Sequence, residues 1–511
     1  MRSTLKLVMS ALVLASVVAC GDTPITLSTP DGPVAGVQRG NTRSFFGLPF
    51  AAPPVGALRF APPVPPTAWT ATRDATALPP ACAQVRLADR VSDPDASEDC
   101  LYLNVWAPAG VGPFPVMIFL PGGAYVIGSA SDPTVAGERL SDEGGVIVVV
   151  ANYRLGALGF LAHSAFATEE GRSTGDFGML DQRAALTWVQ KNIGAFGGDP
   201  SNVTMFGQSA GAGSACVQLV SPGSAGLFHK VILESPLCTG VVLPTRAEAE
   251  AQADSFAAAL GCTGSDAEIR TCLRAKSTAE IVEGLPLNKN LLFGEGVAWQ
   301  PIVDGVTLTD QPAALLAAGV SRDIPMIVGS NADEGSLFFF KDGIVNSDAD
   351  YLAMLIDVFG PVRAEAVARV FPSDSNPQES AKRLVSELWT CDARRIARLH
   401  QGAGGTAYHY YFTRETYNVF TGLGAVHGGE LPFVFGTTLA GIPILPAGIP
   451  LTRSMQAYWS TFARTGVPND GREAWHPYDP AIDESLRFDL EVSHIRGVRS
   501  AVCDQWDSLL R

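Results

Sequence analysis

A serine between two glycines carries the clearest chemical signal in this sequence. In the stretch VTMFGQSAGAGS, Ser209 lies two residues after Gly207 and two residues before Gly211. Glycines at these positions leave room for a sharp, strained turn between a strand and a helix, which exposes a serine nucleophile. So short a pattern also occurs by chance, but the apolar run before it and the small residues after it fit a strand and a helix. We therefore expect Ser209 to be a nucleophile rather than an ordinary turn serine.

A serine nucleophile needs a base, and the base needs an acid that fixes its tautomer. For a serine at a strand–turn–helix, the expected chain order is nucleophile, acid, base. Among the seven histidines, His427 alone lies in a glycine-rich loop, TGLGAVHGGELPFVFG. The acid should follow the end of a strand, and IPMIVGSNADEGS offers Asp333 and Glu334 there. The spacing of the residues does not choose between these two carboxylates.

Backbone N–H groups that stabilise a developing alkoxide are expected at a second turn. The stretch IFLPGGAYVIG is a predicted strand followed by Gly122, Gly123 and Ala124, and Ala210 directly follows the nucleophile. A plain glycine turn is the alternative, but the position after an early strand favours a role in catalysis.

Strands that alternate with helices must position these residues. Short apolar runs predict buried strands at residues 116–122, 145–154, 203–207, 230–235 and 324–330. One amphipathic run predicts a helix at residues 180–196. This alternation is typical of an α/β protein with a mostly parallel sheet. Residues 246–283 and 348–400 are predicted to be helical insertions that form a cap, and residues 30–80 a proline-rich loop region. We expect one large domain over residues 31–511.

The composition is that of an acidic globular protein. Its net charge of −15 argues against a nucleic-acid or anionic-membrane surface, which needs clustered Lys and Arg. Residues 1–19 resemble a secretory signal, and the ending VVAC predicts lipidation at Cys20 with a tether over residues 20–30. Ordinary cleavage that removes Cys20 is the alternative, and no later apolar run is long enough to span a membrane. We expect an exported protein, either a cell-envelope lipoprotein or a secreted or periplasmic one, whose only membrane contact is that lipid anchor.

Export makes the eight cysteines after Cys20 candidates for disulfides. Two pairs flank short segments and could close small loops: Cys82 with Cys100, and Cys262 with Cys272. The chain has no CxxC and no Cys/His cluster at metal-ligand spacing, so we expect no metal site.

Several motifs together resemble the type-B carboxylesterase/lipase family, which includes cholinesterases and p-nitrobenzyl esterases. They are FFGLPFAAPPVGALRFAPP, SEDCLYLNVWAP, ANYRLGALGFL, FGGDPSNVTMFGQSAGA, DEGS and HGGELPFVFG, spread from about residue 30 to the C-terminus. The resemblance implies an α/β-hydrolase fold: a large, mostly parallel central sheet flanked by helices, with helical insertions as a cap. It also implies that no cofactor is needed.

The resemblance further implies residue roles. The triad would be Ser209 as nucleophile, Glu334 rather than Asp333 as acid, and His427 as base. The oxyanion hole would be the N–H groups of Gly123, Ala124 and Ala210. The implied disulfides are Cys82–Cys100, Cys262–Cys272 and Cys391–Cys503, which leaves Cys216 and Cys238 as either a fourth bridge or two thiols.

Departures from the family pattern bear on the substrate. Pro121 stands where the family usually has His or Tyr, Ala124 replaces the third glycine of its loop, and Gln208 replaces the usual Glu. The methyl group of Ala124 should reshape the pocket, and the loss of a charge at position 208 should weaken any preference for cationic substrates. The loop over residues 83–99 has no aromatic side chain, so we expect no cation–π site for choline.

Leu337 and Phe338, and with less support Trp299, are expected to line an apolar pocket; plain core packing is the alternative at each. We expect a serine carboxylic-ester hydrolase that forms an acyl-enzyme, with small to medium apolar esters as its small-molecule partners. The alternatives are an interfacial lipase or polyester hydrolase, and a non-catalytic binding member of the fold.

Overall fold

The computed structural model describes residues 22–167, 175–287, 296–339, 344–415, 422–439 and 441–509. The predicted signal segment 1–19 and the lipidation site Cys20 lie outside these ranges. Among the helices within them, none is both long and apolar enough to cross a membrane.

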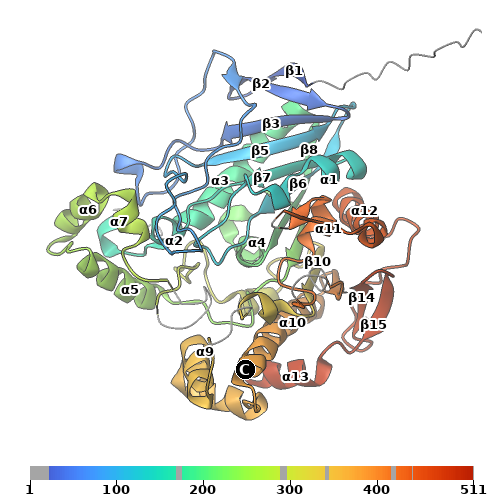
Figure 1. Cartoon of the computed structure of the whole chain (residues 1–511). Helices are drawn as coiled ribbons and strands as arrows, with labels where there is room; N and C mark the ends of the chain where they lie inside the picture. The colour runs from blue at the N-terminus through green and yellow to red at the C-terminus, as the bar shows by residue number, and fades with distance from the viewer. Residues whose placement is uncertain are drawn as a thin grey trace, which may run out of the picture.

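A 13-stranded mixed sheet runs through the centre of the molecule (Figure 1). Its path is β1-β2-β3-β5-β7-β6-β8-β9-β10-β11-β14-β15, with β4 paired to β2, and β12 and β13 form a separate hairpin. The strands are β1 (Thr23–Thr29), β2 (Gly32–Arg39), β3 (Thr42–Pro49), β4 (Arg73–Asp74), β5 (Tyr102–Pro108), β6 (Phe114–Leu120), β7 (Ile147–Ala151), β8 (Gly198–Gln208), β9 (Lys230–Glu234), β10 (Met326–Asn331), β11 (Ala407–Phe412), β12 (Thr438–Leu439), β13 (Ile442–Pro443), β14 (Glu484–Phe488) and β15 (Ser493–Arg496).

The middle of the sheet, from β7 to β14, is parallel throughout, and antiparallel strands flank it on both sides. Strands β7, β9 and β10 are buried along their whole length, as their continuous apolar runs predict. The predicted strands therefore form, and their carboxyl ends meet at one edge, where open α/β sheets place their binding sites.

Helices cover both faces of the sheet. They are α1 (Glu138–Gly144), α2 (Gly156–Phe160), α3 (Phe177–Asn192), α4 (Ala210–Val220), α5 (Arg246–Ala259), α6 (Asp266–Ala275), α7 (Thr278–Val282), α8 (Pro312–Ala317), α9 (Asp348–Val370), α10 (Pro377–Gly402), α11 (Leu431–Phe435), α12 (Ile449–Thr465) and α13 (Ser500–Leu509). One apolar core packs α3 and α4 against the sheet, and a second packs α1, α11 and α12 against the other face. A third core joins α9, α10 and α13. The two predicted insertions are thus helical, as α5–α7 and α9–α10. Helices α5–α7 lie beside the sheet and α9 lies below it in Figure 1, whereas α10 packs against β10 and β11.

Two expectations for the N-terminal region are wrong. Residues 23–29, assigned to a tether, form β1, and residues 32–49, assigned to a loop region, contain all of β2 and β3. Strand β1 pairs antiparallel with β2, and Thr29 Oγ1 accepts hydrogen bonds from the N–H groups of Asp31 and Gly32 in the turn between them. Thr, Ser, Gly and Pro interrupt the apolar residues of these strands, so no apolar run is longer than two residues apart from proline.

Four disulfides tie the structure together. Three are the expected pairs, Cys82–Cys100, Cys262–Cys272 and Cys391–Cys503, and Cys216–Cys238 is a fourth bridge rather than two thiols. Disulfides in this number are typical of proteins that fold in an oxidising compartment.

Candidate active site

Ser209 occupies a strained turn between β8 and α4. Its backbone angles are φ 58° and ψ −127°, a region that costs a non-glycine residue about 1–3 kcal/mol. Its N–H donates to the Glu234 carbonyl oxygen at 2.9 Å, which ties the turn to β9. A Cβ on Gly207 would collide with the Gly211 carbonyl, and one on Gly211 with the Leu120 carbonyl. The glycines are therefore required by close packing of backbone against backbone, as the pattern predicted.

The carboxyl group of Glu334 contacts the imidazole of His427 at Nδ1. Nδ1 of His427 lies 2.5 Å from Glu334 Oε2, and the Glu334 side chain is fully buried. The other carboxylate oxygen, Oε1, accepts hydrogen bonds from Ser235 Oγ at 2.6 Å and from the Asn331 N–H at 2.7 Å. Two donors thus fix one oxygen, and the second faces the imidazole, an arrangement that holds the Nδ1–H tautomer and stabilises an imidazolium.

The geometry distinguishes the two neighbouring carboxylates that the spacing left open. Asp333 Oδ2 accepts a hydrogen bond from the Ala425 N–H at 2.9 Å, and the Asp333 N–H donates to the Ala425 carbonyl at 3.0 Å. Asp333 therefore shapes the loop that carries His427, whereas Glu334 contacts the ring itself.

The other nitrogen of His427 points toward the serine turn. Nε2 lies 3.2 Å from Gln208 Nε2, on the residue that precedes Ser209. With the proton on Nδ1, this Nε2 is an acceptor, and the Gln208 amide can donate to it. Within the described residues no hydrogen bond joins Ser209 Oγ to His427. Such bonds are often long in the absence of substrate and tighten when it binds.

Three backbone N–H groups, in the loop after β6 and directly after Ser209, donate no hydrogen bond among the described residues. The loop after β6 packs against the turn so closely that a Cβ on Gly122 would lie 3.1 Å from Ser209 Cβ. In this loop Gly123 and Ala124 both have positive φ, of 120° and 53°. Among the hydrogen bonds of the described chain, none uses the N–H of Gly123, Ala124 or Ala210 as donor. Unpaired backbone donors next to a nucleophile are what an oxyanion hole requires.

Two further acidic residues, Glu430 and Glu234, are buried in the same region as Glu334. Burial, together with the neighbouring Glu334 charge, raises the pKa of Glu430 to about 7, and burial raises the pKa of Glu234 well above its usual value. Asn331 Nδ2 donates to Glu430, and Trp459 Nε1 donates to Glu234 at 2.6 Å. Burial thus disfavours the charged forms of both acids, and the carboxyl group in contact with the imidazole is that of Glu334.

Aromatic side chains pack around His427. Phe338 and the buried Trp389 of α10 stack on each other, with ring centroids 5.3 Å apart, and lie 5.3 and 4.6 Å from the His427 ring. Phe338 is thus next to the imidazole of His427, while Leu337 is 39 % exposed and Trp299 is buried against Phe256 of α5 at 5.4 Å. Trp299 is therefore packed in the core, which was the alternative to a position in the pocket.

Ser235, Asn331 and Trp389 were not identified from the sequence. Ser235 and Asn331 both stand at the carboxyl ends of strands, β9 and β10, and that position is the only signal that could have found them. Trp389 lies in the middle of a helix and gives no signal of its own.

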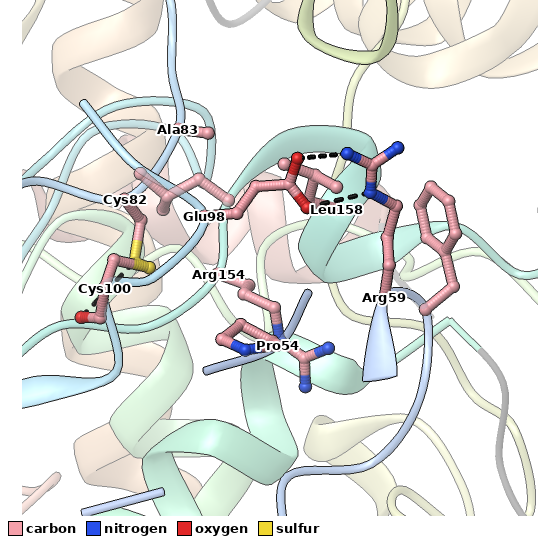
Figure 2. A pocket seen from close by; sticks show the side chains of 10 residues that line it. Pro54, Arg59, Cys82, Ala83, Glu98, Cys100, Arg154 and Leu158 are labelled. Carbon is pink, nitrogen blue, oxygen red and sulfur yellow. Dashed lines mark hydrogen bonds and ion pairs between the residues drawn. A yellow bond between two sulfur atoms is a disulfide. The ribbon is translucent and has the colours of Figure 1, made fainter. Parts of the chain in front are cut away.

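A buried ion pair lies beside the loop that the Cys82–Cys100 disulfide closes. Figure 2 shows Arg59 paired with Glu98 near the Cys82–Cys100 bridge. These residues line a small cavity of about 10 Å³. Arg59 Nε donates to Glu98 Oε2 at 2.8 Å, and its Nη1 donates to the Lys276 carbonyl just after α6. One guanidinium therefore joins the first disulfide loop to the α5–α7 insertion.

In the described ranges, one group of side chains is close enough to share a metal ion: His476, Glu484 and His494. It shares no residue with the turn at Ser209 or with the His427–Glu334 pair.

Comparisons with known proteins identify the family of the chain. Residues 23–506 match the model of the carboxylesterase family. The chain is 36 % identical to the fumonisin B1 esterase of Sphingopyxis macrogoltabida, over 93 % of this chain and 88 % of that protein. It is 35 % identical to the para-nitrobenzyl esterase of Bacillus subtilis, over 91 % of this chain and 95 % of that protein. A solved structure of a PNB esterase superposes with a TM-score of 0.83 at 34 % identity, over 94 % of this chain and 99 % of that one. The chain therefore belongs to the carboxylesterase family and is an ester-hydrolysing enzyme with the α/β-hydrolase fold.

Proposed function

We propose that Ser209, Glu334 and His427 form the catalytic triad of a carboxylesterase. The observation that carries this proposal is the position of His427, whose Nδ1 faces the buried Glu334 and whose Nε2 faces the turn at Ser209. For catalysis the Gln208 amide must give up its place at Nε2 to the Ser209 hydroxyl. Imidazole Nε2 then takes the hydroxyl proton as Oγ attacks the ester carbonyl.

The N–H groups of Gly123, Ala124 and Ala210 then stabilise the oxyanion of the tetrahedral intermediate. All three are free to donate, and Ala210 is the first residue of α4, whose positive dipole end faces the same point. His427 returns the proton to the leaving alcohol, which leaves an acyl group on Ser209. A water activated by His427 then hydrolyses the acyl-enzyme.

We infer that small to medium apolar esters are the substrates. Phe338, beside His427, supplies an apolar surface next to the reacting atoms, and Gln208 places an uncharged amide where a carboxylate would attract a cation. We also propose that the chain is exported, either lipidated at Cys20 or cleaved nearby. The four disulfides support export.

Hydrolysis of p-nitrophenyl acetate, butyrate, octanoate and palmitate tests this assignment, with Ser209→Ala as the matched control. We expect turnover of the short esters that the variant loses by several orders of magnitude. A rate that rises sharply above the solubility limit of the long esters would instead indicate an interfacial lipase. A folded wild-type protein with no Ser209-dependent turnover of any of the four would refute the proposed triad on these substrates.

A further inference from the structure

Two imidazoles and one carboxylate meet at the edge of the sheet, in residues that the ester chemistry does not use. His476 Nδ1 lies 2.9 Å from Glu484 Oε1, and His494 Nδ1 lies 3.1 Å from the same oxygen. The two imidazole rings are nearly parallel, with centroids 5.2 Å apart. One ligand atom from each of the three residues lies within 4.8 Å of the other two. We call these three residues the edge cluster.

These distances suit a metal ion. Zn²⁺ binds imidazole nitrogen at about 2.0–2.1 Å and carboxylate oxygen at about 2.0–2.2 Å, so neighbouring ligand atoms of a tetrahedral site are about 3.4 Å apart. The nitrogen-to-oxygen separations in the edge cluster are a few tenths of an ångström shorter than this. Small outward movements of the three side chains therefore open a site with three protein ligands and a fourth position for water.

Outer partners orient two of the three ligands. Glu473 Oε1 lies 3.1 Å from His494 Nε2, the ring nitrogen that faces away from Glu484. Arg496 Nε donates to Glu484 Oε2 at 3.0 Å, which leaves Oε1 toward the histidines. A histidine that ligates through one nitrogen and pairs with a carboxylate through the other is the usual arrangement at protein metal sites, because the carboxylate fixes the tautomer and raises the ligand's basicity.

The backbone holds the edge cluster in place. In the β14–β15 hairpin Glu484 pairs with Arg496, and His494 lies two residues before Arg496, so its side chain is on the same face. His476 directly follows Trp475, which is buried among aromatic rings. The Trp475 N–H donates to the Asn469 side chain at 2.6 Å, and Asn469 Nδ2 donates back to the Trp475 carbonyl at 3.0 Å. The ligands therefore come from a hairpin and from a loop that is itself fixed.

The charge around the edge cluster favours a cation. Glu473 and Glu484 contribute two negative charges and Arg496 one positive charge, and the nearby Arg472 is already paired with Asp470 at 3.0 Å. Two imidazole nitrogens select Zn²⁺ and similar transition metals over Mg²⁺ and Ca²⁺, which prefer oxygen. We propose that His476, Glu484 and His494 bind one divalent transition-metal ion of the Zn²⁺ class, with Glu473 and Arg496 as positioning residues. The ion ties the loop at Trp475 to the last hairpin of the sheet, so its role is structural.

Zn²⁺ binding to the metal-stripped protein tests this proposal, by isothermal titration and by competition with a chromophoric zinc indicator. We expect one Zn²⁺ per chain at neutral pH, with Mg²⁺ and Ca²⁺ unable to compete. His476→Ala, Glu484→Gln and His494→Ala should each lower the affinity at least tenfold. Glu473→Gln should lower it by about 10–100-fold, although it removes no ligand. His229→Ala, which changes a histidine outside the edge cluster, should bind Zn²⁺ like the wild type.

Ester turnover serves as the folding control, because none of these residues is in the proposed triad. In variants that keep wild-type turnover, loss of Zn²⁺ binding supports the site. Zn²⁺ should also raise the Tm of the wild type, as a ligand that binds the folded state does, and should not raise that of His494→Ala. The proposal is overturned if the wild type takes up no Zn²⁺ at 100-fold excess over the chain, or if the three ligand variants bind it as tightly as the wild type. The edge cluster would then be an ion-pair network only.

Discussion

Replacing Glu334 by glutamine should abolish most of the activity without unfolding the protein. In the wild type, Glu334 Oε1 accepts from Ser235 Oγ and from the Asn331 N–H, and Oε2 faces His427 Nδ1. The Asn331 N–H can only donate, so the glutamine must turn its oxygen to that side and its NH₂ toward Nδ1. His427 then has to accept at Nδ1 and carry its proton on Nε2, where it can no longer take the serine proton.

This wrong tautomer sets the size of the effect. In a Ser–His–Asp enzyme, removal of the charge with the geometry kept lowers kcat by about 10⁴-fold, equivalent to about 5.5 kcal/mol of transition-state stabilisation. We expect a loss of the same order in Glu334→Gln. The KM should change little because Glu334 is fully buried behind the imidazole. The assay is steady-state hydrolysis of p-nitrophenyl butyrate, with Tm measured on the same samples.

Asp333→Asn is the matched control, since it removes the same charge one residue earlier. Its oxygen can still accept from the Ala425 N–H, so we expect a loss below about tenfold. Glu334 is not the triad acid if folded Glu334→Gln keeps more than a tenth of the wild-type kcat, or if Asp333→Asn loses as much activity as Glu334→Gln.

Three other predictions concern stability and the serine turn. Arg59→Ala leaves the buried Glu98 without its cation and should cost about 3–5 kcal/mol of unfolding free energy, seen as a lower Tm; an unchanged Tm would contradict the anchoring role. Burial raises the pKa of Glu430 from 4.5 to about 7, so the folded protein keeps a proton there that the unfolded chain releases as the pH rises. The free energy of unfolding should therefore fall between about pH 4.5 and 7, and Glu430 should account for about 3 kcal/mol of this fall at most. Urea unfolding of Glu430→Gln across the same pH range should show a correspondingly smaller fall. If the free energy of unfolding changes with pH equally in the wild type and the variant, Glu430 does not carry this proton. Gly211→Ala places a methyl group against the Leu120 carbonyl and should lower both kcat and Tm, whereas wild-type values would show that the turn tolerates a Cβ.

Chain order and turn chemistry made much of the site predictable from the sequence. The residues around Ser209 must be small because the turn between strand and helix is tightly packed. The structure shows this directly, since a Cβ on Gly207 or Gly211 would collide with a backbone carbonyl. His427 was selected because a glycine-rich loop can bring an imidazole to the end of a strand. The choice between Asp333 and Glu334 was different, because adjacent carboxylates on a turn have the same spacing. The residues alone left it open, and only the resemblance to a family favoured Glu334.

Features that depend on tertiary contacts were not predictable in this way. Trp389 reaches the imidazole from the middle of α10, and Ser235 reaches Glu334 from the end of a different strand. Strand β1 was not predicted because this short edge strand is half exposed and has no continuous apolar run. The edge cluster matches no local motif because its three ligands come from a loop and two strands, brought together by hairpin register.

Covalent labelling of the nucleophile tests the central claim most directly. The wild type and Ser209→Ala would be treated with a fluorophosphonate, and the site and number of labels determined by intact mass and peptide mapping. We expect one label per chain, on Ser209, with loss of ester turnover in proportion to labelling, and an unlabelled, inactive variant. A label on another residue that abolishes turnover, or ester hydrolysis at the wild-type rate by Ser209→Ala, would contradict it.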